Sequence, residues 1–142
     1  NNKHTESICI TGLASGVDSL GILGFPKSIV FLGESLKGFI NKKQRDSIRL
    51  KAKDKALKEG LVLSHKLPHE KMGKYEYKNA LHERNLFVVL LADSVHPLEF
   101  GMKSGTNNAV HHAVKNNRKI YTPKNLVTKA VIDKYQDKIT FY

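Results

Sequence analysis

Gly101-Met102-Lys103-Ser104-Gly105-Thr106-Asn107-Asn108 has the composition of a turn that opens a helix. It follows the apolar run Leu86–Ala92 and the segment Val95–Phe100, each of which suits a buried strand. Behind the turn, small apolar residues recur at helical spacing: Ala109, Val110, Ala113 and Val114. The order of strand, turn and helix is the unit from which parallel α/β sheets are built.

The beginning of that helix is a candidate anion-binding site. Unpaired N–H groups of a first helical turn point away from the helix, and the helix dipole favours negative charge there. Gly105 would let the backbone approach a ligand closely, and Lys103 adds a positive charge. Ser104 and Thr106 offer hydroxyl groups, although either of them serves equally well as an ordinary helix cap.

A second loop of the same kind occurs near the start of the chain. Ser7–Ile10 suits a short buried strand, Thr11–Asp18 a Gly/Ser loop, and the residues from Ser19 to Phe25 a short apolar helix. Loops that follow parallel strands converge at the carboxyl edge of the sheet. We therefore expect residues of both loops to line one phosphate pocket: Gly12, Ser15, Gly16, Ser104, Gly105 and Thr106.

Short apolar runs alternate with helical patterns along the rest of the chain. Strands are expected at Ser7–Thr11, Ser28–Leu32, Leu61–Ser64, Leu86–Leu91, Val95–Phe100 and Lys119–Tyr121, and helices at Val17–Gly24, Lys42–Glu59, Asn107–Asn117 and Lys124–Gln136. The run Leu86–Leu91 suits a helix equally well, and His65–Lys78 suits a surface loop. This alternation predicts an α/β fold with a doubly wound, mostly parallel sheet and helices on both faces.

The charge of the chain favours a polyanionic partner. Lys and Arg number 24 against 13 acidic residues, which gives a net charge of +11. Much of this surplus lies between Lys42 and Lys58, in a segment with only a thin apolar face. That segment is either a solvated outer face of a helix or a nucleic-acid contact surface, for which Lys51, Lys55 and Lys58 are the candidates.

Five short motifs, in order along the chain, resemble the DNA-processing protein A (DprA/Smf) family of the Rossmann-like nucleotide-binding superfamily. The family's Ser-Gly-x-Ala-x-Gly-Ile/Val-Asp loop resembles Thr11–Asp18, and its strand ending in Val-Leu-Gly resembles Ile29–Gly33. Its Ser-Glu-x-Pro segment resembles Ser64–Pro68. Its Arg-Asn-Arg resembles Arg84-Asn85-Leu86, and its Lys-Ser-Gly-Ser/Thr resembles Lys103–Thr106. The resemblance spans Ile8 to Pro123, and it adds Arg84 and Asn85 to the expected phosphate-binding residues.

The chain departs from the family pattern at three places. Leu86 replaces the second arginine of Arg-Asn-Arg, and Ser15 replaces the basic residue usual in the first loop. Both replacements remove positive charge from the expected pocket. The family's domain begins with another strand that ends in a Gly-Ser-Arg turn, and nothing before Ile8 matches it. We therefore expect residues 1–142 to form a single Rossmann-like domain without its first strand, taken from a longer chain.

The resemblance implies a single-stranded DNA-binding protein that acts in DNA processing and recombination without catalysis. Its candidate partners are single-stranded DNA, a recombinase of the RecA type and a second copy of the chain. The same superfamily leaves two alternatives open, a sensor that binds a small nucleotide in the same pocket and a phosphoribohydrolase. The phosphoribohydrolase motif needs an acid where this chain has Ala109, so we expect no enzyme activity of that kind.

Other chemistry has little support in the sequence. The single cysteine, Cys9, lies inside an expected buried strand, without a base placed to activate it. No group of histidines has metal-ligand spacing, and no nucleophile elbow occurs, so we expect no metal, no cofactor and no catalytic residues. No apolar run is long enough to span a bilayer, and no signal-peptide pattern occurs, so a cytoplasmic location is the simplest expectation.

Overall fold

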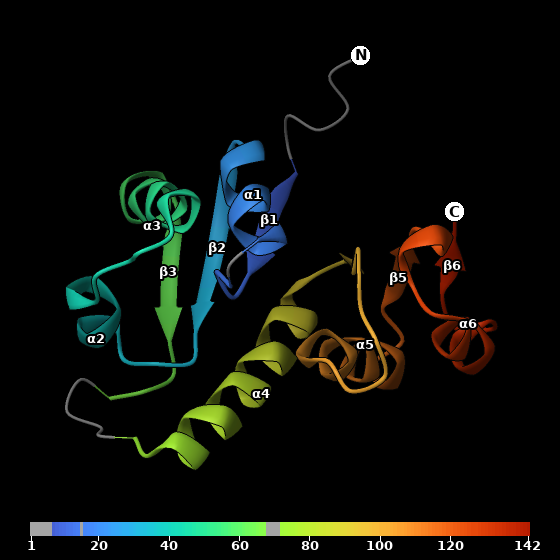
Figure 1. The fold of residues 1–142 in the computed structure, drawn as a ribbon. Coiled ribbons are helices and arrows are strands. Elements are labelled where there is room, and N and C mark those ends of the chain that lie inside the picture. The colour runs from blue at the N-terminus through green and yellow to red at the C-terminus, as the bar shows by residue number, and fades with distance from the viewer. Residues whose placement is uncertain (1–6, 15, 68–71) are drawn as a thin grey trace. The chain divides into compact units, whose positions relative to one another are not determined.

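The computed structural model describes residues 7–14, 16–67 and 72–142, which form helices and short parallel strands (Figure 1). The chain divides into two compact units, Asn1–Arg84 and Asn85–Tyr142. The expectation of a single domain over residues 1–142 stays a prediction. Two parallel sheets flanked by helices confirm the predicted α/β class.

The first unit contains a three-stranded sheet in the order β1-β2-β3. Both strand pairs are parallel, with Ile10 opposite Ile29 and Phe31 opposite Leu63. The elements of this unit follow one another as β1 (Ile8–Thr11), α1 (Val17–Gly24), β2 (Lys27–Leu32), α2 (Leu36–Asn41), α3 (Ser47–Glu59) and β3 (Leu61–Ser64), after which α4 (Lys74–Leu91) begins. The predictions for α1 and β3 have the observed bounds, and those for β1 and β2 differ by one residue at the start.

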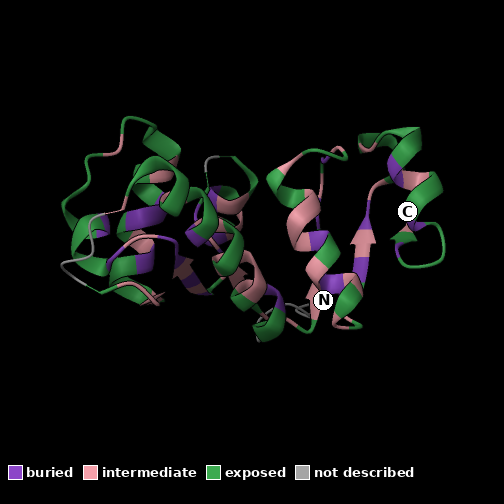
Figure 2. Cartoon of the chain, turned by 90° about the horizontal axis from the view of Figure 1, so that it is seen from below, coloured by how far each residue is buried: buried purple, intermediate pink, exposed green. Residues whose placement is uncertain are grey.

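The core of the first unit lies between its sheet and the helices α1 and α3. Residues on β2 alternate between buried and partly exposed positions, as a strand with one fully covered face requires. Helices α1 and α3 contact each other as well as strands of the sheet, and Figure 2 shows buried positions on strands and helices alike. The buried cluster consists of Leu13, Ile22, Val30, Leu32, Phe39, Ala52 and Ala56.

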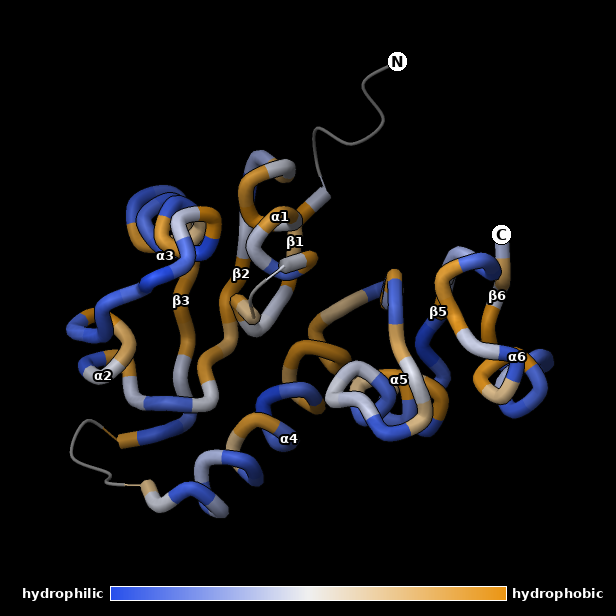
Figure 3. Tube along the Cα trace, viewed as in Figure 1, coloured by the Kyte–Doolittle hydropathy of each residue, from blue (hydrophilic) through white to orange (hydrophobic). Residues whose placement is uncertain are grey.

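Helix α2 is an element that the sequence did not predict, and the expected helix Lys42–Glu59 is shorter than expected, because its first five residues are not helical. Ser35 caps the beginning of α2 by accepting a hydrogen bond from the Gly38 N–H at 3.1 Å. Helix α3 begins only at Ser47, because Asp46 caps it by accepting from two backbone N–H groups. The connection between the two helices consists mostly of hydrophilic residues (Figure 3).

Lys53 joins these two helices from inside the protein. Its side chain is buried, with 6% of the residue exposed, and its Nζ donates to the carbonyl oxygens of Phe39, Ile40 and Lys42 at 2.7–2.9 Å. The carbonyl groups of a last helical turn have no partners within the helix, so a buried ammonium group satisfies them where water cannot. Lys53 therefore fixes the end of α2 against α3.

Helix α4 corrects two predictions. The expected strand Leu86–Leu91 is its last part, so the helical alternative is the correct one, and the expected loop His65–Lys78 ends where the helix begins at Lys74. Along α4 the residues change from hydrophilic at the first turns to hydrophobic at the last turns (Figure 3). A short window over the apolar end contains too few polar residues to show helical periodicity.

The second unit contains a three-stranded parallel sheet in the order β4-β5-β6. Its elements are β4 (Ser94–Val95), α5 (Gly105–Lys115), β5 (Lys119–Thr122), the 3-10 helix η1 (Lys124–Leu126), α6 (Lys129–Tyr135) and β6 (Thr140–Phe141). The expected strand Val95–Phe100 is wrong beyond its first residue, although Phe100 makes a single parallel bridge to Val127. The expected helix Lys124–Gln136 is interrupted at Val127, and β6 was not predicted.

The core of the second unit is separate from that of the first. It is formed by Val89, Phe100, Val110, Ala113, Ile120, Val131, Tyr135 and Ile139. Thr122, at the end of β5, is fully buried and donates its hydroxyl hydrogen to the carbonyl oxygen of Pro97. This bond attaches the segment after β4 to the neighbouring strand.

Within the part of the chain that the structure describes, none of the helices has the length and apolar character needed to cross a membrane.

Candidate anion-binding site

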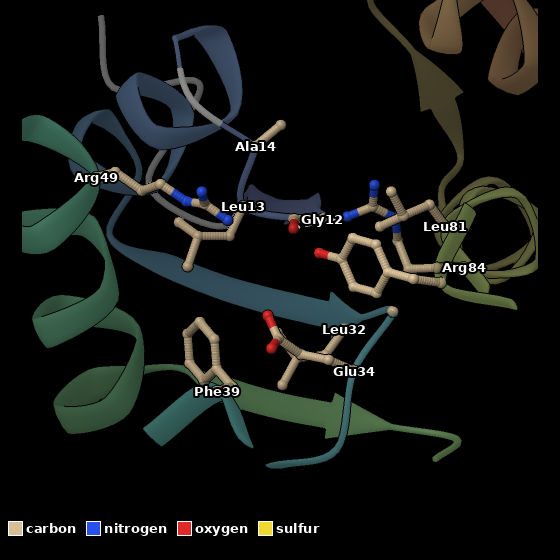
Figure 4. Close-up of a pocket in the computed structure, with 11 residues that line it drawn as sticks. Gly12, Leu13, Ala14, Leu32, Glu34, Phe39, Arg49, Leu81 and Arg84 are labelled. Atoms are coloured by element: carbon tan, nitrogen blue, oxygen red, sulfur yellow. Dashed lines mark hydrogen bonds between the residues drawn. The ribbon is translucent and has the colours of Figure 1, made fainter. Parts of the chain in front are cut away.

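A cavity of about 180 Å³ lies in the first unit where β1 and β2 end. The carboxyl ends of parallel strands are the usual place for ligands in open α/β sheets. Three elements complete its wall beside the strands, namely α2, α3 and α4 (Figure 4). The lining residues are Gly12, Leu13, Ala14, Leu32, Gly33, Glu34, Phe39, Arg49, Tyr77, Leu81 and Arg84.

The loop after β1 is held in one conformation by the beginning of α1. The Asp18 carboxylate accepts a hydrogen bond from the Ala14 N–H at 3.0 Å, and the Ser19 hydroxyl donates to the Ala14 carbonyl at 2.9 Å. Leu13 has a φ of 55°, which is uncommon for a residue with a branched side chain, and its side chain is fully buried. Burial of Leu13 thus stabilises a loop conformation that would be strained by itself.

Gly16 and Ser15 were expected to bind phosphate in this loop. Gly16 precedes α1 with a φ of 85°, a conformation in which glycine avoids the strain of other residues. Apart from its chain neighbours, no described residue lies within 4 Å of the position where a Cβ atom of Gly16 would stand, so the backbone is open to a ligand on that side. Ser15 lies outside the described residues.

Arg84 enters the cavity from α4, as the resemblance implied. Its Nη1 donates to the carbonyl oxygen of Gly12 at 2.6 Å, and a Cβ atom at Gly12 would stand only 1.5 Å from this nitrogen. Burial lowers the pKa of Arg84, and repulsion by Arg49 acts in the same direction, while Asp18 and Tyr77 raise it. Two guanidinium groups therefore share one partly buried environment.

Arg49 is a cavity residue that the sequence reasoning did not select. It lies in the basic segment Lys42–Lys58 but was not distinguished from the lysines around it. Its side chain extends from α3 toward the segment at Gly12 and Leu13, from the side opposite Arg84 (Figure 4). No local signal distinguishes Arg49, because only the packing of α3 shows which of its basic side chains faces the cavity.

Glu34 places a carboxylate in the same cavity. It follows β2, where an acid could accept a hydrogen bond from a ribose hydroxyl. Its Oε1 lies 3.3 Å from Nζ of Lys42, and this lysine also lies 5.7 Å from the centre of the Tyr77 ring. The pairing with Lys42 offsets the negative charge of Glu34, so the wall of the cavity is positive on balance.

The second unit contains a turn before α5 at the place where the sequence predicts one. Ser104 caps the helix by accepting from the Asn107 N–H at 3.1 Å, and its hydroxyl donates to the Gly101 carbonyl at 2.8 Å. Asn85 donates from Nδ2 to Oδ1 of Asn108 at 3.2 Å and to the Gly105 carbonyl at 3.4 Å. The Ser104 hydroxyl and Asn85 thus hold the start of α5 in place.

Lys103, Gly105 and Thr106 are exposed at this turn. Beyond its chain neighbours and the backbone of α5 itself, no atom of the described residues lies within 4 Å of a Cβ position at Gly105, which leaves that side of the first turn open. The turn belongs to the second unit and the Gly12–Gly16 loop to the first. Their convergence on one pocket stays a prediction.

The lysines of α3 have different environments. Lys51 and Lys58 are exposed, as the sequence led us to expect. The expectation that Lys55 is solvated is wrong, because its Nζ donates to the carbonyl oxygens of Leu23 and Phe25 at 3.2 and 2.7 Å. Lys55 therefore caps the end of α1 and is not a freely solvated charge.

Cys9 is a free cysteine whose side chain is partly buried. Burial raises the pKa of the Cys9 thiol to about 11, and the nearby Asp18 carboxylate raises it further. A thiol with a raised pKa is a poor nucleophile at neutral pH. Over residues 7–14, 16–67 and 72–142, no group of three His, Cys, Asp or Glu side chains could hold a metal ion.

Parallel three-stranded sheets, helices around them and a cavity where two strands end define a Rossmann-like α/β protein. The chain belongs to the DNA recombination-mediator protein A family, whose sequence model matches residues 2–138. A search among curated proteins finds no match.

Two solved structures have the same fold as this chain. DNA processing protein A from Streptococcus pneumoniae matches 98% of the chain with 21% identity and a TM-score of 0.73. DNA processing protein A from Helicobacter pylori, whose structure concerns its single-stranded DNA binding mode, matches 94% of the chain with 20% identity and a TM-score of 0.74. The chain spans 49% and 60% of the lengths of these two proteins.

Proposed function

We propose that this chain binds single-stranded DNA in DNA processing and recombination, and that it does so without catalysis. The observation that carries the proposal is the cavity where β1 and β2 end, with guanidinium groups of Arg49 and Arg84 in its wall. Family membership supports the proposal, and so does the net charge of +11. A recombinase of the RecA type and a second copy of the chain are further partners that the family resemblance implies.

Phosphate groups are the part of DNA that each of the two Gly/Ser loops would bind. The Gly12–Gly16 loop has open backbone at Gly16, and the first turn of α5 is open at Gly105. Open N–H groups and the positive end of a helix dipole both favour an anion. The exposed lysines Lys51 and Lys58 would attract the same polyanion over a longer range.

A titration of a thymidine oligomer at several salt concentrations tests the proposal. For single-stranded DNA, the logarithm of the affinity should fall linearly with the logarithm of the salt concentration, by about 0.7 per neutralised phosphate. Affinity that stays constant between low and moderate salt would contradict the proposal. So would the absence of binding at low salt.

A nucleotide sensor that uses the same cavity is the second candidate. Two positions at which the family carries basic residues hold Ser15 and Leu86 here, which weakens the case for a long polyanion. The cavity also contains Glu34, which could accept a hydrogen bond from a sugar hydroxyl. Mass spectrometry of small molecules released from the purified protein distinguishes the two, because a bound nucleotide without oligonucleotide affinity would favour the sensor.

A phosphoribohydrolase is the least supported function. That reaction needs an acid to stabilise an oxocarbenium-like transition state, and Ala109 stands where the motif places it. Ala109 lies in α5, two turns at most from the helix start at Gly105. Release of a free base from a nucleoside monophosphate would contradict the proposal of binding without catalysis.

A further inference from the structure

Arg49 has a feature that sets it apart from the other basic residues around the cavity. Its Nε atom is buried and has no hydrogen-bond partner among the residues that the structure describes. A buried N–H group without a partner is costly, and native proteins usually supply one from the protein, from water or from a ligand. Arg49 lines the cavity, so a ligand bound in the cavity could supply the acceptor.

The electrostatics of the cavity call for an anion. Arg84 approaches the Gly12–Leu13 segment from one side and Arg49 from the other (Figure 4). Repulsion between the two guanidinium groups acts to lower the pKa of Arg84. Lys42 already offsets the Glu34 carboxylate at 3.3 Å. An anion between the two arginines would relieve their repulsion and also give Arg49 Nε its missing acceptor.

Arg49 also brings positive charge to the loop after β1. This loop has Ser15 where the resemblance led us to expect a basic residue. A guanidinium group from α3 reaches the same loop from another part of the chain. Its planar fork suits the oxygen atoms of a phosphate group better than the ammonium group of lysine does.

We propose that Arg49 is a phosphate-binding residue of this cavity, and that a phosphate group lies between its guanidinium group and that of Arg84. The inference rests on the proposed function in that it takes phosphate as the ligand chemistry. The phosphate could belong to the backbone of a DNA strand or to a single nucleotide. Both sources present the same oxygen atoms, and the experiment separates them.

The experiment measures the affinity of three variants for a thymidine oligomer and for thymidine 5′-monophosphate. Arg49→Gln should lower the affinity about 10-fold or more, as expected for loss of a charge-assisted hydrogen bond in a partly buried site. Arg49→Lys should recover only part of this loss, because it keeps the charge but not the fork. Arg45→Gln is the matched control, since Arg45 is an exposed arginine four positions earlier that does not line the cavity, and it should leave the monophosphate affinity unchanged.

The pattern over the two ligands identifies the source of the phosphate. An equal loss for both ligands assigns a single nucleotide phosphate to the site. A loss for the oligomer alone, with a salt dependence that is smaller by about 0.7, assigns a backbone phosphate. Equal affinities of Arg49→Gln and Arg45→Gln for both ligands would overturn the inference and leave the proposed function standing.

A spectroscopic readout keeps the inference testable if the oligomer does not bind or if Arg49→Gln does not fold. The Nε–H resonance of Arg49 in the unchanged protein should shift on titration with inorganic phosphate, while that of Arg45 should not. Absence of a shift at saturating phosphate would overturn the inference. A shift without oligomer binding would support it and would count against DNA as the ligand.

Discussion

Arg84 and Gly12 are joined by a hydrogen bond of 2.6 Å from Nη1 to the carbonyl oxygen, although 72 residues separate them in the sequence. The bond brings α4 to the loop after β1 and closes one side of the cavity. It also explains the glycine, because any side chain at residue 12 would occupy the place of the guanidinium group. The backbone of the loop and the position of a basic group are thus determined together.

Gly12→Ala should displace Arg84 and weaken phosphate binding. The new Cβ atom would stand 1.5 Å from Nη1, so the flexible end of Arg84 must move and its hydrogen bond is lost. We expect the free energy of unfolding to fall by about 1.5–3 kcal/mol, the range for hydrogen bonds to charged groups. Urea unfolding measures this change. Gly24→Ala is the control, because in the described part of the chain no other side chain or strand lies within 4 Å of its Cβ position, and an equal loss there would contradict the explanation.

Gly105→Ala should raise the stability of the protein and weaken its ligand binding. Gly105 is the first residue of α5, is exposed and has open space around its Cβ position. Alanine favours a helix over glycine by up to about 1 kcal/mol, so thermal unfolding should show a slightly more stable protein. If the backbone there contacts a phosphate, the added methyl group should weaken ligand binding in a titration. Unchanged affinity would exclude Gly105 from the binding surface.

The parts of the fold that follow from local sequence were predictable. Helix α1 and strand β3 have the expected bounds. Ser104 caps α5, which is the ordinary helix-cap role that the sequence offered for this residue. The end of helix α4 was harder to predict, because Leu86–Leu91 lacks the polar residues that reveal helical periodicity. Its tertiary contacts, such as that of Arg84 with Gly12, decide the outcome and are not visible in a short window.

The candidate site was only partly predictable for a similar reason. Gly12 and Arg84 were expected and do line one cavity, whereas Arg49 was hidden in a run of basic residues. Lys53 was hidden in the same run, and it binds three carbonyl groups inside the protein. A basic residue on an amphipathic helix is normally solvated, so only the packing of α3 shows which of its cations point inward.

Lys53→Met should destabilise the protein, while Lys51→Met should not. Methionine is of similar length, but it leaves the carbonyl oxygens at the end of α2 without their donor. We expect a loss of about 1–3 kcal/mol in the free energy of unfolding, the cost of leaving buried polar groups unpaired. Lys51 is exposed in the same helix and loses the same charge, so its change should stay within about 0.5 kcal/mol. Similar losses of stability for both variants would mean that the positive charge on α3, and not the hydrogen bonds of Lys53, stabilises the protein.

Cys9 should react slowly with iodoacetamide, and its rate should rise with pH up to about 11. Burial, with a smaller contribution from Asp18, disfavours the thiolate in the folded protein. Because the folded pKa is raised above the ordinary value of 9.0, the unfolded chain loses its proton first. This thiol therefore contributes stability that is complete below pH 9 and is lost between pH 9 and about 11. Cys9→Ser should remove that dependence, and rapid alkylation at pH 8 would show that the thiol is not shielded.

Lys103→Ala should weaken binding of a mononucleotide and of an oligomer alike, by about 1–3 kcal/mol, the range for charge-assisted hydrogen bonds. Lys103 stands beside the first turn of α5, where open N–H groups add to its charge. The double variant Lys51→Ala/Lys58→Ala is the comparison, since both residues are exposed on α3. It should weaken only the oligomer, because neither lysine lines the cavity, and its effect on the mononucleotide should stay within about 0.5 kcal/mol. Lys55 is left intact in this comparison, because it caps α1 and its loss would change the fold as well as the charge. Equal losses for both ligands in the double variant would mean that α3 supports the pocket itself, and the division of the basic surface into a binding site and a steering helix would be wrong.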